Sequence, residues 1–219
     1  ALWVAAPVLA LWLLAPLVAH DISRSLEREV EELSAADKRR LRTLARRTWL
    51  YFEQFVGPED NWLPPDNVQM GGNSVTAHRT SPTNIGLLLL STLSAHDLGY
   101  LGLVDLSLRL KQTMEVLGRL ERYRGHILNW YDTRTLQPLN PRYVSSVDSG
   151  NLLGSLIALS EGCYELIGER ISPERGWLGL LDTVDVLIQT LTPPLGEESE
   201  LVGHLTELRG RVASGAQQA

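Results

Sequence analysis

The chain has 219 residues, of which 44% are hydrophobic and 21% are charged, and its formal net charge is −6. This hydrophobic share allows a packed core and excludes an intrinsically disordered chain. The excess of acidic residues disfavours a nucleic-acid partner, because phosphate binding needs concentrated Lys and Arg.

The first segment predicts a transmembrane helix. Residues 1–19 carry no charged side chain, and about 20 apolar residues are enough to cross a bilayer. No basic segment precedes them, as it would in a signal peptide, and Trp3 and Trp12 suit a membrane helix. We therefore assign residues 1–20 to a span that contacts the lipid bilayer, and we interpret the chain as a fragment of a larger protein.

The residues behind this span are rich in Arg and Lys. Arg24 and Arg28 come first, and six more basic residues lie between positions 38 and 47. Positive charge close behind a span favours the cytoplasmic side. We expect residues 21–33 to be a juxtamembrane linker and residues 34–219 to be cytoplasmic. The basic cluster at 38–47 is interleaved with apolar residues, which is more typical of a solvated helix face or a membrane-proximal stripe than of a binding site.

Helical periodicity dominates the rest of the chain. A first helix begins at Ser34 and runs to about Phe55. Five further helices are predicted over residues 83–98, 103–123, 148–167, 178–191 and 197–212. The first and third of these five are apolar on nearly all sides and the second is amphipathic, as concentric layers of helices require. One short hairpin is expected, with a strand at 126–131 and a turn at 133–138.

Two polar segments lead into the apolar helices and form the candidate site. The loop over residues 57–82 exceeds twenty residues, a length that is usually functional or disordered. Residues 125–159 read GHILNWYDTRTLQPLNPRYVSSVDSGNLLGSLIAL and combine aromatic rings with carboxylates and amides. A sugar needs this combination, because its C–H face stacks on rings and its hydroxyl rim needs hydrogen bonds. Packing of the same rings in the core is the alternative.

The candidate substrate-binding residues come from both polar segments. The stacking candidates are Trp62, Trp130 and Tyr143. The other candidates for sugar contacts are Asp66, Asn67, Arg79, Asn84, Tyr131, Asp132, Arg142 and Asn151. For Arg79 the alternative is an ion pair with Asp66 or Asp148 that fixes the loop. For Asp132 the alternative is an Asx turn.

Asp148 is the carboxylate best placed to support catalysis. It lies at the start of a buried helix in a polar stretch. Its alternative role is to cap that helix, which would lower its pKa and suit a nucleophile, a base or a hydroxyl anchor better than a general acid. Retaining glycoside chemistry needs two carboxyl groups about 5–5.5 Å apart. We therefore assign Asp148 a supporting role only.

Metal and cofactor sites are not expected. The His residues at positions 78, 96, 126 and 204 show no metal-ligand spacing. Cys163 is the single cysteine, and a small buried thiol is its default role.

Three motifs carry a resemblance to a known family. They are RRTWLYFEQFVGPEDNWLPPDNVQ, TAHRTSPTNIGLLLLSTLSAHDLGYL and HILNWYDTRTLQPLNPRYVSSVDSGNLLGSL. They resemble the glycoamylase-like middle region of cyclic β-1,2-glucan synthases, and LWLLAPLVAHDISR resembles the end of the membrane segment of these enzymes. The resemblance covers the chain to about residue 161 and is weaker after residue 176.

This resemblance implies part of a large enzyme of the bacterial inner membrane. Such enzymes join a UDP-glucose-dependent glucosyltransferase, the middle domain and a phosphorylase-like domain. The middle domain is an (α/α)₆ barrel that cyclises a linear β-1,2-glucan by transglycosylation, and it looks related to endo-β-1,2-glucanases, which hydrolyse the same polymer. Residues 34–219 are then expected to be the N-terminal half of this all-α domain and to bind the linear β-1,2-glucan.

A half barrel has consequences of its own. The full barrel needs twelve helices and this chain supplies about six, so its partner would be the remainder of the parent polypeptide. We expect the inner faces of residues 83–98 and 148–167 to stay exposed and to cause aggregation. The main catalytic acids are expected outside the chain, which would leave the isolated fragment inactive. The alternatives are an endo-β-1,2-glucanase-like hydrolase domain and a non-catalytic fragment that binds or anchors glucan.

Overall fold

The computed structural model describes residues 2–23, 32–71, 74–168, 172–196 and 199–216. Its helices are α1 (Leu2–Ile22), α2 (Ala35–Phe55), α3 (Pro82–Asp97), α4 (Leu103–Arg119), α5 (Ser146–Gly168), α6 (Pro173–Leu195) and α7 (Glu200–Ala216). Its strands are β1 (Val68–Gln69), β2 (Val75–Thr76), β3 (Arg79–Thr80), β4 (Arg122–Tyr123), β5 (His126–Ile127), β6 (Asn129–Asp132) and β7 (Pro138–Tyr143). The chain separates into two compact units, Ala1–Ala36 and Asp37–Ala219. The predicted all-α class is confirmed.

The first unit contains the apolar helix α1. The stretch Ala5–Ile22 has a mean hydropathy of 1.7 and none of it is buried, so by length and composition it could cross a membrane. Two residues of the predicted linker, Asp21 and Ile22, continue this helix. The linker residues 24–31 lie outside the part of the chain that the structure describes. The membrane location of α1 stays a prediction.

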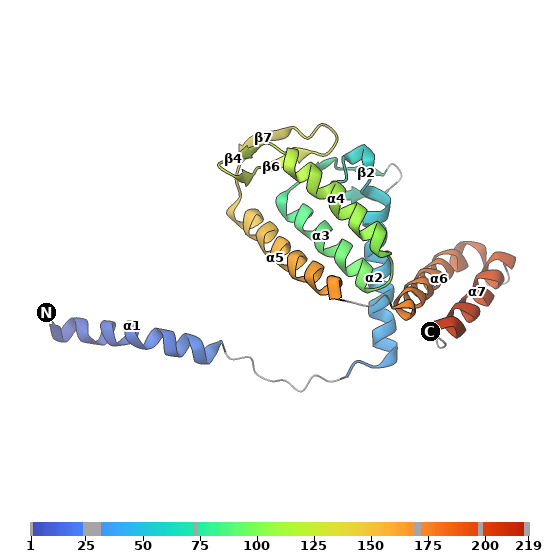
Figure 1. Cartoon of the computed structure of the whole chain (residues 1–219), viewed down its shortest axis with the longest axis horizontal. Helices are drawn as coiled ribbons and strands as arrows, with labels where there is room; N and C mark the ends of the chain where they lie inside the picture. The colour runs from blue at the N-terminus through green and yellow to red at the C-terminus, as the bar shows by residue number, and fades with distance from the viewer. Residues whose placement is uncertain (1, 24–31, 72–73, 169–171, 197–198, 217–219) are drawn as a thin grey trace. The chain divides into compact units, whose positions relative to one another are not determined.

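Helix α3 is the centre of the second unit. The hydroxyl of Ser81 accepts a hydrogen bond from the backbone N–H of Asn84 at 3.3 Å, and Pro82 occupies the first turn. Helices α2, α4 and α5 lie around α3, and α5 runs in the same direction as α3 while α4 runs in the opposite direction (Figure 1). Two parallel inner helices joined through an antiparallel outer helix are the repeating unit of an (α/α) barrel. Helices α3 to α5 have this arrangement (Figure 1), which agrees with the predicted partial (α/α)₆ barrel.

Helices α3 and α5 approach each other closely at Gly86 of α3 and at Gly162 of α5. A Cβ atom at Gly86 would lie 2.6 Å from Oγ of Ser155. One at Gly162 would lie closer still to Cδ2 of Leu93, so a larger residue at either position would push the two helices apart. Gly150 and Gly154 of α5 do not contribute to this approach, because a Cβ atom at either of them would meet nothing within 4 Å.

Two apolar clusters form the core around α3. The larger cluster joins α3, α4, α5 and the β4–β7 region and contains Leu63, Ile85, Leu89, Val116, Leu117, Leu120, Ile127, Leu128, Tyr131, Leu152 and Leu159. The smaller cluster joins α2 to α3 and contains Trp49, Phe52, Val56, Leu88 and Ala95. Helix α3 contributes to both clusters, which confirms the prediction that this apolar helix is an inner one.

Helix α5 turns its second apolar face to solvent. Only Leu152, Ser155 and Leu159 of this helix are buried among its described residues. Leu153 and Ile157 are more than half exposed. These are the exposed inner-face side chains on which the predicted aggregation depends, and the aggregation itself stays a prediction.

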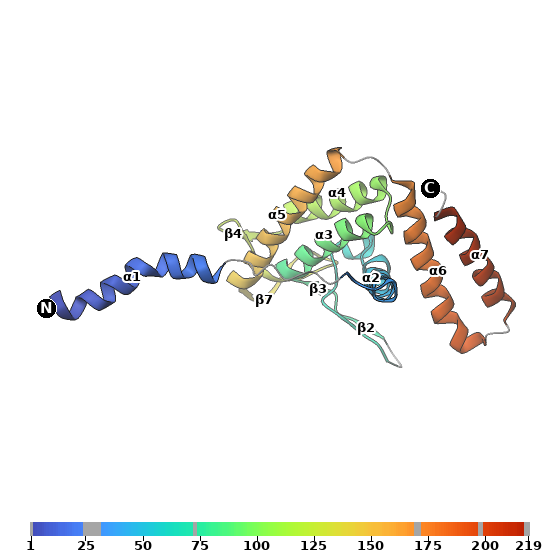
Figure 2. The same ribbon diagram turned by 90° about the horizontal axis from the view of Figure 1, so that it is seen from below.

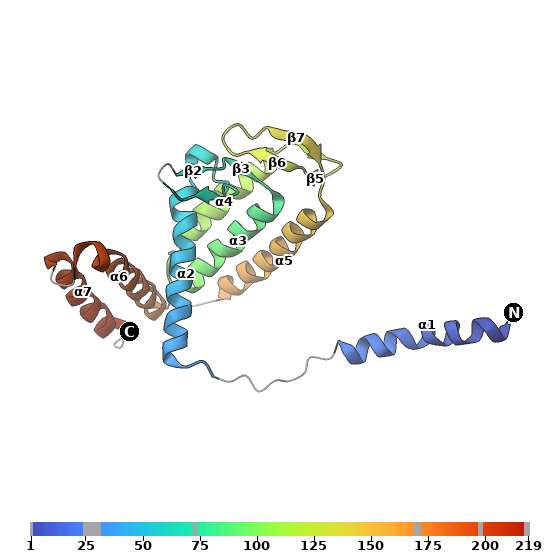
Figure 3. The ribbon, with the colours of Figure 1, turned by 180° about the vertical axis from the view of Figure 1, so that it is seen from behind.

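The short strands lie over the end of the unit at which α3 and α5 begin (Figures 1 and 3). Strands β3, β6 and β7 form one antiparallel sheet in the order β3-β6-β7. The predicted hairpin is present as β6 and β7. The predicted strand at 126–131 is divided into β5 and β6, and β1 and β2 form a separate hairpin that projects away from the helices (Figure 2).

Four predicted helix boundaries are wrong by four or five residues: the end of α4, both ends of α6 and the end of α7. The helix expected over residues 103–123 ends at Arg119, and the next residues turn into β4. The hydroxyl of Tyr131 donates to the backbone oxygen of Glu121 at 2.6 Å, which holds this segment in the sheet region. Helix α6 begins at Pro173, five residues earlier than expected, because the side chain of Ser172 caps it by accepting from the N–H of Arg175.

The basic cluster on α2 is not simply a solvated stripe. Arg42 forms an ion pair with Asp182 of α6 at 2.7 Å. Arg46 donates to the hydroxyl of Thr183 at 2.9 Å and pairs with Glu53 at 2.9 Å. The prediction missed this because the acceptors on α6 lie about 140 positions away in the sequence. Part of the cluster therefore fastens α2 to α6.

Candidate functional site

The sheet of β3, β6 and β7 sorts the candidate residues onto two faces. Arg79 lies opposite Asp132, and Thr80 lies opposite Tyr131. Because successive residues of a strand point to opposite faces, Arg79 and Trp130 share the outer face of the sheet. Thr80 and Tyr131 share the inner face, where both are fully buried. The outer face is the one that a ligand can reach.

The carboxylate of Asp66 gathers four N–H donors. Arg79 donates to Oδ2 from Nη2 at 2.9 Å and from Nε at 3.2 Å. Asn67 donates to the same oxygen at 3.0 Å, and Asn84 donates to Oδ1 at 3.5 Å. Asp66 thus joins the long loop to β3 and to the first turn of α3. The ion pair between Arg79 and Asp66, one of the two predicted alternatives for Arg79, is present.

Arg79 also contacts the candidate stacking residue. The Cζ atom of its guanidinium lies 5.0 Å from the ring centroid of Trp130, within the range of a cation–π contact. Trp130 is half-buried. Three residues from three separate segments, Asp66, Arg79 and Trp130, therefore meet at one place.

Asp148 lies where α3 and α5 begin. Four hydrogen-bonding side chains surround its carboxylate: Ser145, Thr83, Asn129 and Ser81. Burial raises the pKa of the Asp148 carboxyl, but these hydrogen bonds outweigh burial and hold the pKa below its ordinary value. The cap of α5 is Ser145, whose hydroxyl accepts from the N–H of Asp148 at 3.1 Å. The suggested capping role of Asp148 is therefore wrong, and its ionised carboxylate acts as an acceptor between the two helices.

Asn151 connects α5 to α3 beside Asp148. Its side-chain amide donates to the hydroxyl of Thr83 at 3.1 Å. Thr83 precedes Asn84, the residue that contacts Asp66. We use the name polar cluster for the connected set at the beginning of α3 and α5, which consists of Asp66, Asn67, Arg79, Asn84, Trp130, Asp148 and Asn151.

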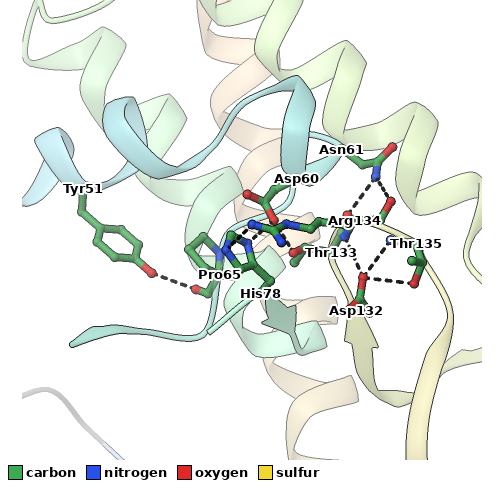
Figure 4. A network of polar contacts seen from close by, with 9 residues as sticks. All are labelled: Tyr51, Asp60, Asn61, Pro65, His78, Asp132, Thr133, Arg134 and Thr135. Carbon is green, nitrogen blue, oxygen red and sulfur yellow. Dashed lines mark hydrogen bonds and ion pairs between the residues drawn. The ribbon is translucent and has the colours of Figure 1, made fainter. Parts of the chain in front are cut away.

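A largely buried network supports the loop that carries part of the polar cluster (Figure 4). Asp60 is 8% exposed and accepts hydrogen bonds from Nδ1 of His78 at 2.7 Å and from the hydroxyl of Thr133. Nη2 of Arg134 lies 2.6 Å from Nε2 of His78. Since a guanidinium can only donate, Nε2 accepts in this contact and Nδ1 is the side of the ring that faces Asp60. This network ties the loop to the β6–β7 hairpin.

Sequence reasoning missed this network. Asn61 extends it by donating 2.8 Å hydrogen bonds to the backbone oxygens of Thr133 and Arg134, which lie 72 and 73 positions away. The hydroxyl of Tyr51 fixes the same loop through the backbone oxygen of Pro65 at 2.8 Å. No local pattern reports partners at such separations. The only available signal was a long loop with many hydrogen-bonding residues.

Two of the predicted sugar-contact residues are held by the fold itself. Tyr131 is fully buried, and its hydroxyl accepts from the N–H of Leu128 at 2.7 Å, so the prediction that it contacts sugar is wrong. Asp132 makes the Asx turn that was its alternative, because its Oδ1 accepts from the N–H groups of Arg134 at 3.0 Å and Thr135 at 2.8 Å. Burial raises the pKa of Asp132, but these hydrogen bonds outweigh it and hold the pKa below its ordinary value.

Three further candidates lie apart from the polar cluster. Trp62 lines a hollow beside α4, and its backbone oxygen accepts from Thr113 of that helix at 3.2 Å. Arg142 pairs with Glu121 at 2.8 Å on the β7 side of the sheet, with both side chains about half exposed. Tyr143 is 45% exposed and lines a second hollow with that pair. No described interaction joins the side chains of these three to Trp130, although Tyr143 lies opposite Asn129, the neighbour of Trp130, in the ladder of β6 and β7.

The polar cluster offers hydrogen-bond acceptors and donors rather than a proton donor for catalysis. Asp148 is held ionised, so it does not match a general acid, which must be protonated. The carboxylate of Asp66 is occupied by four N–H donors. Among the described residues no three His, Cys, Asp or Glu side chains are grouped so that they could hold a metal ion. The arrangement therefore suits the binding of a neutral, hydroxyl-rich ligand.

Sequence comparison finds a relative that is much longer than this chain. No protein-family model matches the chain. Over 215 residues the chain is 42% identical to the cyclic β-(1,2)-glucan synthase NdvB of Rhizobium meliloti (strain 1021), an alignment that covers 97% of this chain and 8% of the relative. The chain is thus similar to one short segment of a much longer enzyme, which confirms the predicted resemblance to a fragment of a cyclic glucan synthase.

A solved structure of a glucoamylase-like protein from Bacteroides fragilis NCTC 9343 is also similar in part. The identity is 16% and the TM-score is 0.39, over 86% of this chain and 37% of that chain. A likeness of this size carries no conclusion about the chain.

Proposed function

We propose that the chain binds a linear β-1,2-glucan at the polar cluster, as part of a larger membrane-bound enzyme that processes this polymer. The observation that carries the proposal is the half-buried ring of Trp130 beside side-chain amides at the common end of α3 and α5. The ring would stack on the C–H face of a glucose unit. Asn84 and Asn151 would hydrogen-bond its hydroxyls, and Asp148 would accept from another hydroxyl.

A binding titration with matched tryptophan variants tests this proposal. The full chain would be held in a zwitterionic detergent, because the head groups of sugar detergents could compete, and titrated with linear β-1,2-gluco-oligosaccharides by calorimetry. Trp130→Ala is expected to weaken binding about five- to tenfold, the loss typical of one aromatic contact. Trp62→Ala is the control and should bind as the wild type does, because Trp62 lies beside α4.

The proposal fails if the wild type binds no oligosaccharide or if the two variants lose affinity equally. A β-1,4-linked gluco-oligosaccharide of the same length serves as the comparison ligand. Equal affinity for both linkages would show general sugar binding and would contradict a site for β-1,2-glucan.

In the intact enzyme we propose that this segment supports cyclisation by transglycosylation, with the bond-making acids supplied by other parts of the polypeptide. The occupied carboxylates of Asp66 and Asp148 favour this role over a complete catalytic site. Asp148→Asn in the complete enzyme is expected to reduce the cyclic product while linear polymer continues to form. Unchanged cyclic product would remove Asp148 from the site. Cutting of linear chains without joining would favour the hydrolytic alternative, and the isolated chain is expected to bind glucan without catalysis.

We also propose that α1 anchors the chain in the bacterial inner membrane and that the second unit lies on the cytoplasmic side. The uncharged span and the Arg and Lys residues behind it support this orientation. Protease added to inverted membrane vesicles should degrade the second unit, and protease added to spheroplasts should not. The reverse pattern would contradict the orientation.

A further inference from the structure

The side chain of Arg79 lies between a carboxylate and an aromatic ring. Nε and Nη2 both donate to Oδ2 of Asp66, so the guanidinium is held at two points. Its Cζ atom lies over the ring of Trp130 at 5.0 Å from the centroid. The side chain of Arg79 is 50% exposed, and an arginine in solvent would normally sample many rotamers. Here the carboxylate selects the one that covers the ring.

Asp66 is itself fixed, so the contact rests on a rigid base. Asn67 and Asn84 donate to its carboxylate, and the backbone N–H of Asp66 donates to the oxygen of Ala77 at 3.2 Å. The loop behind it is supported by the network around Asp60 (Figure 4). Movement of Arg79 away from the ring would therefore leave the Asp66 carboxylate in place, with fewer donors.

A guanidinium on one face of an indole leaves the other face for stacking. We propose that Asp66 and Arg79 are positioning residues that hold Trp130 with one ring face covered, so that a β-1,2-glucan stacks on the opposite face. This inference rests on the proposed glucan binding. It gives Arg79 a role different from the direct sugar contact expected from the sequence, and it leaves Trp130 as the residue that touches the substrate.

Fluorine NMR of the tryptophans tests the contact with and without sugar. The six tryptophans of the full chain would be replaced by 5-fluorotryptophan, and Trp130→Phe would assign the signal of Trp130. Arg79→Ala and Asp66→Asn are both expected to move this signal in the absence of sugar. Both should weaken binding of a linear β-1,2-gluco-oligosaccharide roughly three- to tenfold, the range of one cation–π or hydrogen-bond contact.

Two further variants separate positioning from other effects. Arg79→Lys keeps the charge but loses the planar guanidinium, so it should move the signal and should bind with intermediate affinity. Lys111→Ala removes an exposed ion pair with Glu115 on α4, and it should change neither the Trp130 signal nor the affinity.

Two results would overturn the inference. In the first, Arg79→Ala leaves the Trp130 signal in place; if the affinity falls at the same time, Arg79 is a direct sugar contact. In the second, the signal moves but the affinity stays that of the wild type. A wild type that binds no oligosaccharide would instead overturn the proposed function, and the sugar-free spectra would still show whether Arg79 holds the ring.

Discussion

Helices of the second unit carry polar networks at two places, one where α2 meets α6 and one where α3 and α5 begin. In the first network Asp182 is 6% exposed and accepts from Arg42 at 2.7 Å and from the hydroxyl of Tyr100 at 3.1 Å. In the second network Asp66 and Asp148 also have several donors, yet both stay partly exposed, next to a half-buried ring. Both places contain carboxylates, but only the second leaves polar atoms and an aromatic face within reach of a ligand.

The difference is one of desolvation. A buried ion pair stabilises the fold only while every charge keeps its partner, because an unpaired buried charge costs several kcal/mol. A partly exposed carboxylate can exchange a water or a ligand hydroxyl at little cost. The presence of carboxylates therefore does not identify the candidate site in this chain, because both networks contain them. Their partial exposure does.

The largest expected effect comes from removing Asp182 from the network where α2 meets α6, which we call the closed network. Asp182→Ala leaves Arg42 without its carboxylate and leaves Tyr100 with only the backbone oxygen of Arg42 as an acceptor. We expect the free energy of unfolding to fall by about 2–4 kcal/mol, as for other buried pairs that lose one partner. Urea denaturation of the full chain in detergent, followed by far-UV circular dichroism, would measure the change. Glucan affinity at the polar cluster should not change in the folded fraction.

A fall of less than about 0.5 kcal/mol in the free energy of unfolding of Asp182→Ala, the value of an exposed pair, would contradict the structural role of this network. A variant that stayed stable but lost glucan binding would contradict it as well. Either result would mean that the network at α6 is open to ligand or coupled to the site.

A smaller effect is expected at the network where α3 and α5 begin, which we call the open network because its carboxylates stay partly exposed. Asp148→Asn removes the charge that accepts hydrogen bonds at the beginning of α3 and α5, and we expect a loss of about 1–2 kcal/mol in the free energy of unfolding at pH 7. The folded pKa of Asp148 is below its ordinary value. Its contribution is therefore present above the unfolded pKa of about 4 and is lost as the pH falls through the folded pKa.

The pH profile supplies the check on this prediction. The difference in stability between the wild type and Asp148→Asn should be constant from pH 5 to 7 and should shrink below about pH 4. Asp132 also has a lowered pKa, but it is present in both proteins and cancels in the difference. A difference that grew in acid would contradict the assigned direction of the Asp148 shift.

Local sequence patterns were enough to predict the helices but not all of their partners. The apolar run over residues 83–98 predicted the start of α3 to within one residue. The turn residues at 133–138 predicted the β6–β7 hairpin. Both features depend on neighbours in the chain. The role of Arg42 could not be predicted, because its acceptor Asp182 comes from another helix 140 positions later.

The candidate site was predictable to a similar extent. The pair of Asp66 and Arg79 is 13 positions apart in one loop, and the sequence named it as an alternative. Trp62, Trp130 and Tyr131 could not be ranked, because the exposure of a ring is set by tertiary packing. Side chains of β6 alternate between the two faces of the sheet, so Tyr131 is buried while Trp130 stays partly exposed. Trp62 lies beside α4.

Alkaline pH should act on the closed network through Tyr100. Burial raises the pKa of Tyr100, and the negative charge of Asp182 and the hydrogen bond to it raise it further. Below the unfolded pKa near 10 the stability from this shift is fully present, and it declines as the pH rises above that value. The slope for one proton is at most about 1.4 kcal/mol per pH unit. Tyr100→Phe should show a shallower decline from pH 10 to 11, measured by urea denaturation at each pH.

Tyr51 and Tyr131 also have raised pKa values, so the variant should keep part of the alkaline decline. Equal slopes in both proteins would mean that Tyr100 ionises as freely in the folded state as in the unfolded chain. The hydrogen bond to Asp182 would then not persist in solution.

The smallest effect is expected where a pair belongs to neither network. Glu121 and Arg142 form an ion pair at 2.8 Å, and each side chain is about half exposed. Exposed pairs contribute little because water screens their attraction, so Glu121→Gln should change the free energy of unfolding by less than about 0.5 kcal/mol. Its backbone oxygen would still accept from Tyr131. A loss of free energy of unfolding comparable to that of Asp182→Ala would show that exposure does not distinguish carboxylates that stabilise the fold from carboxylates that can bind a ligand. The difference in exposure between the two networks would then not identify the candidate site.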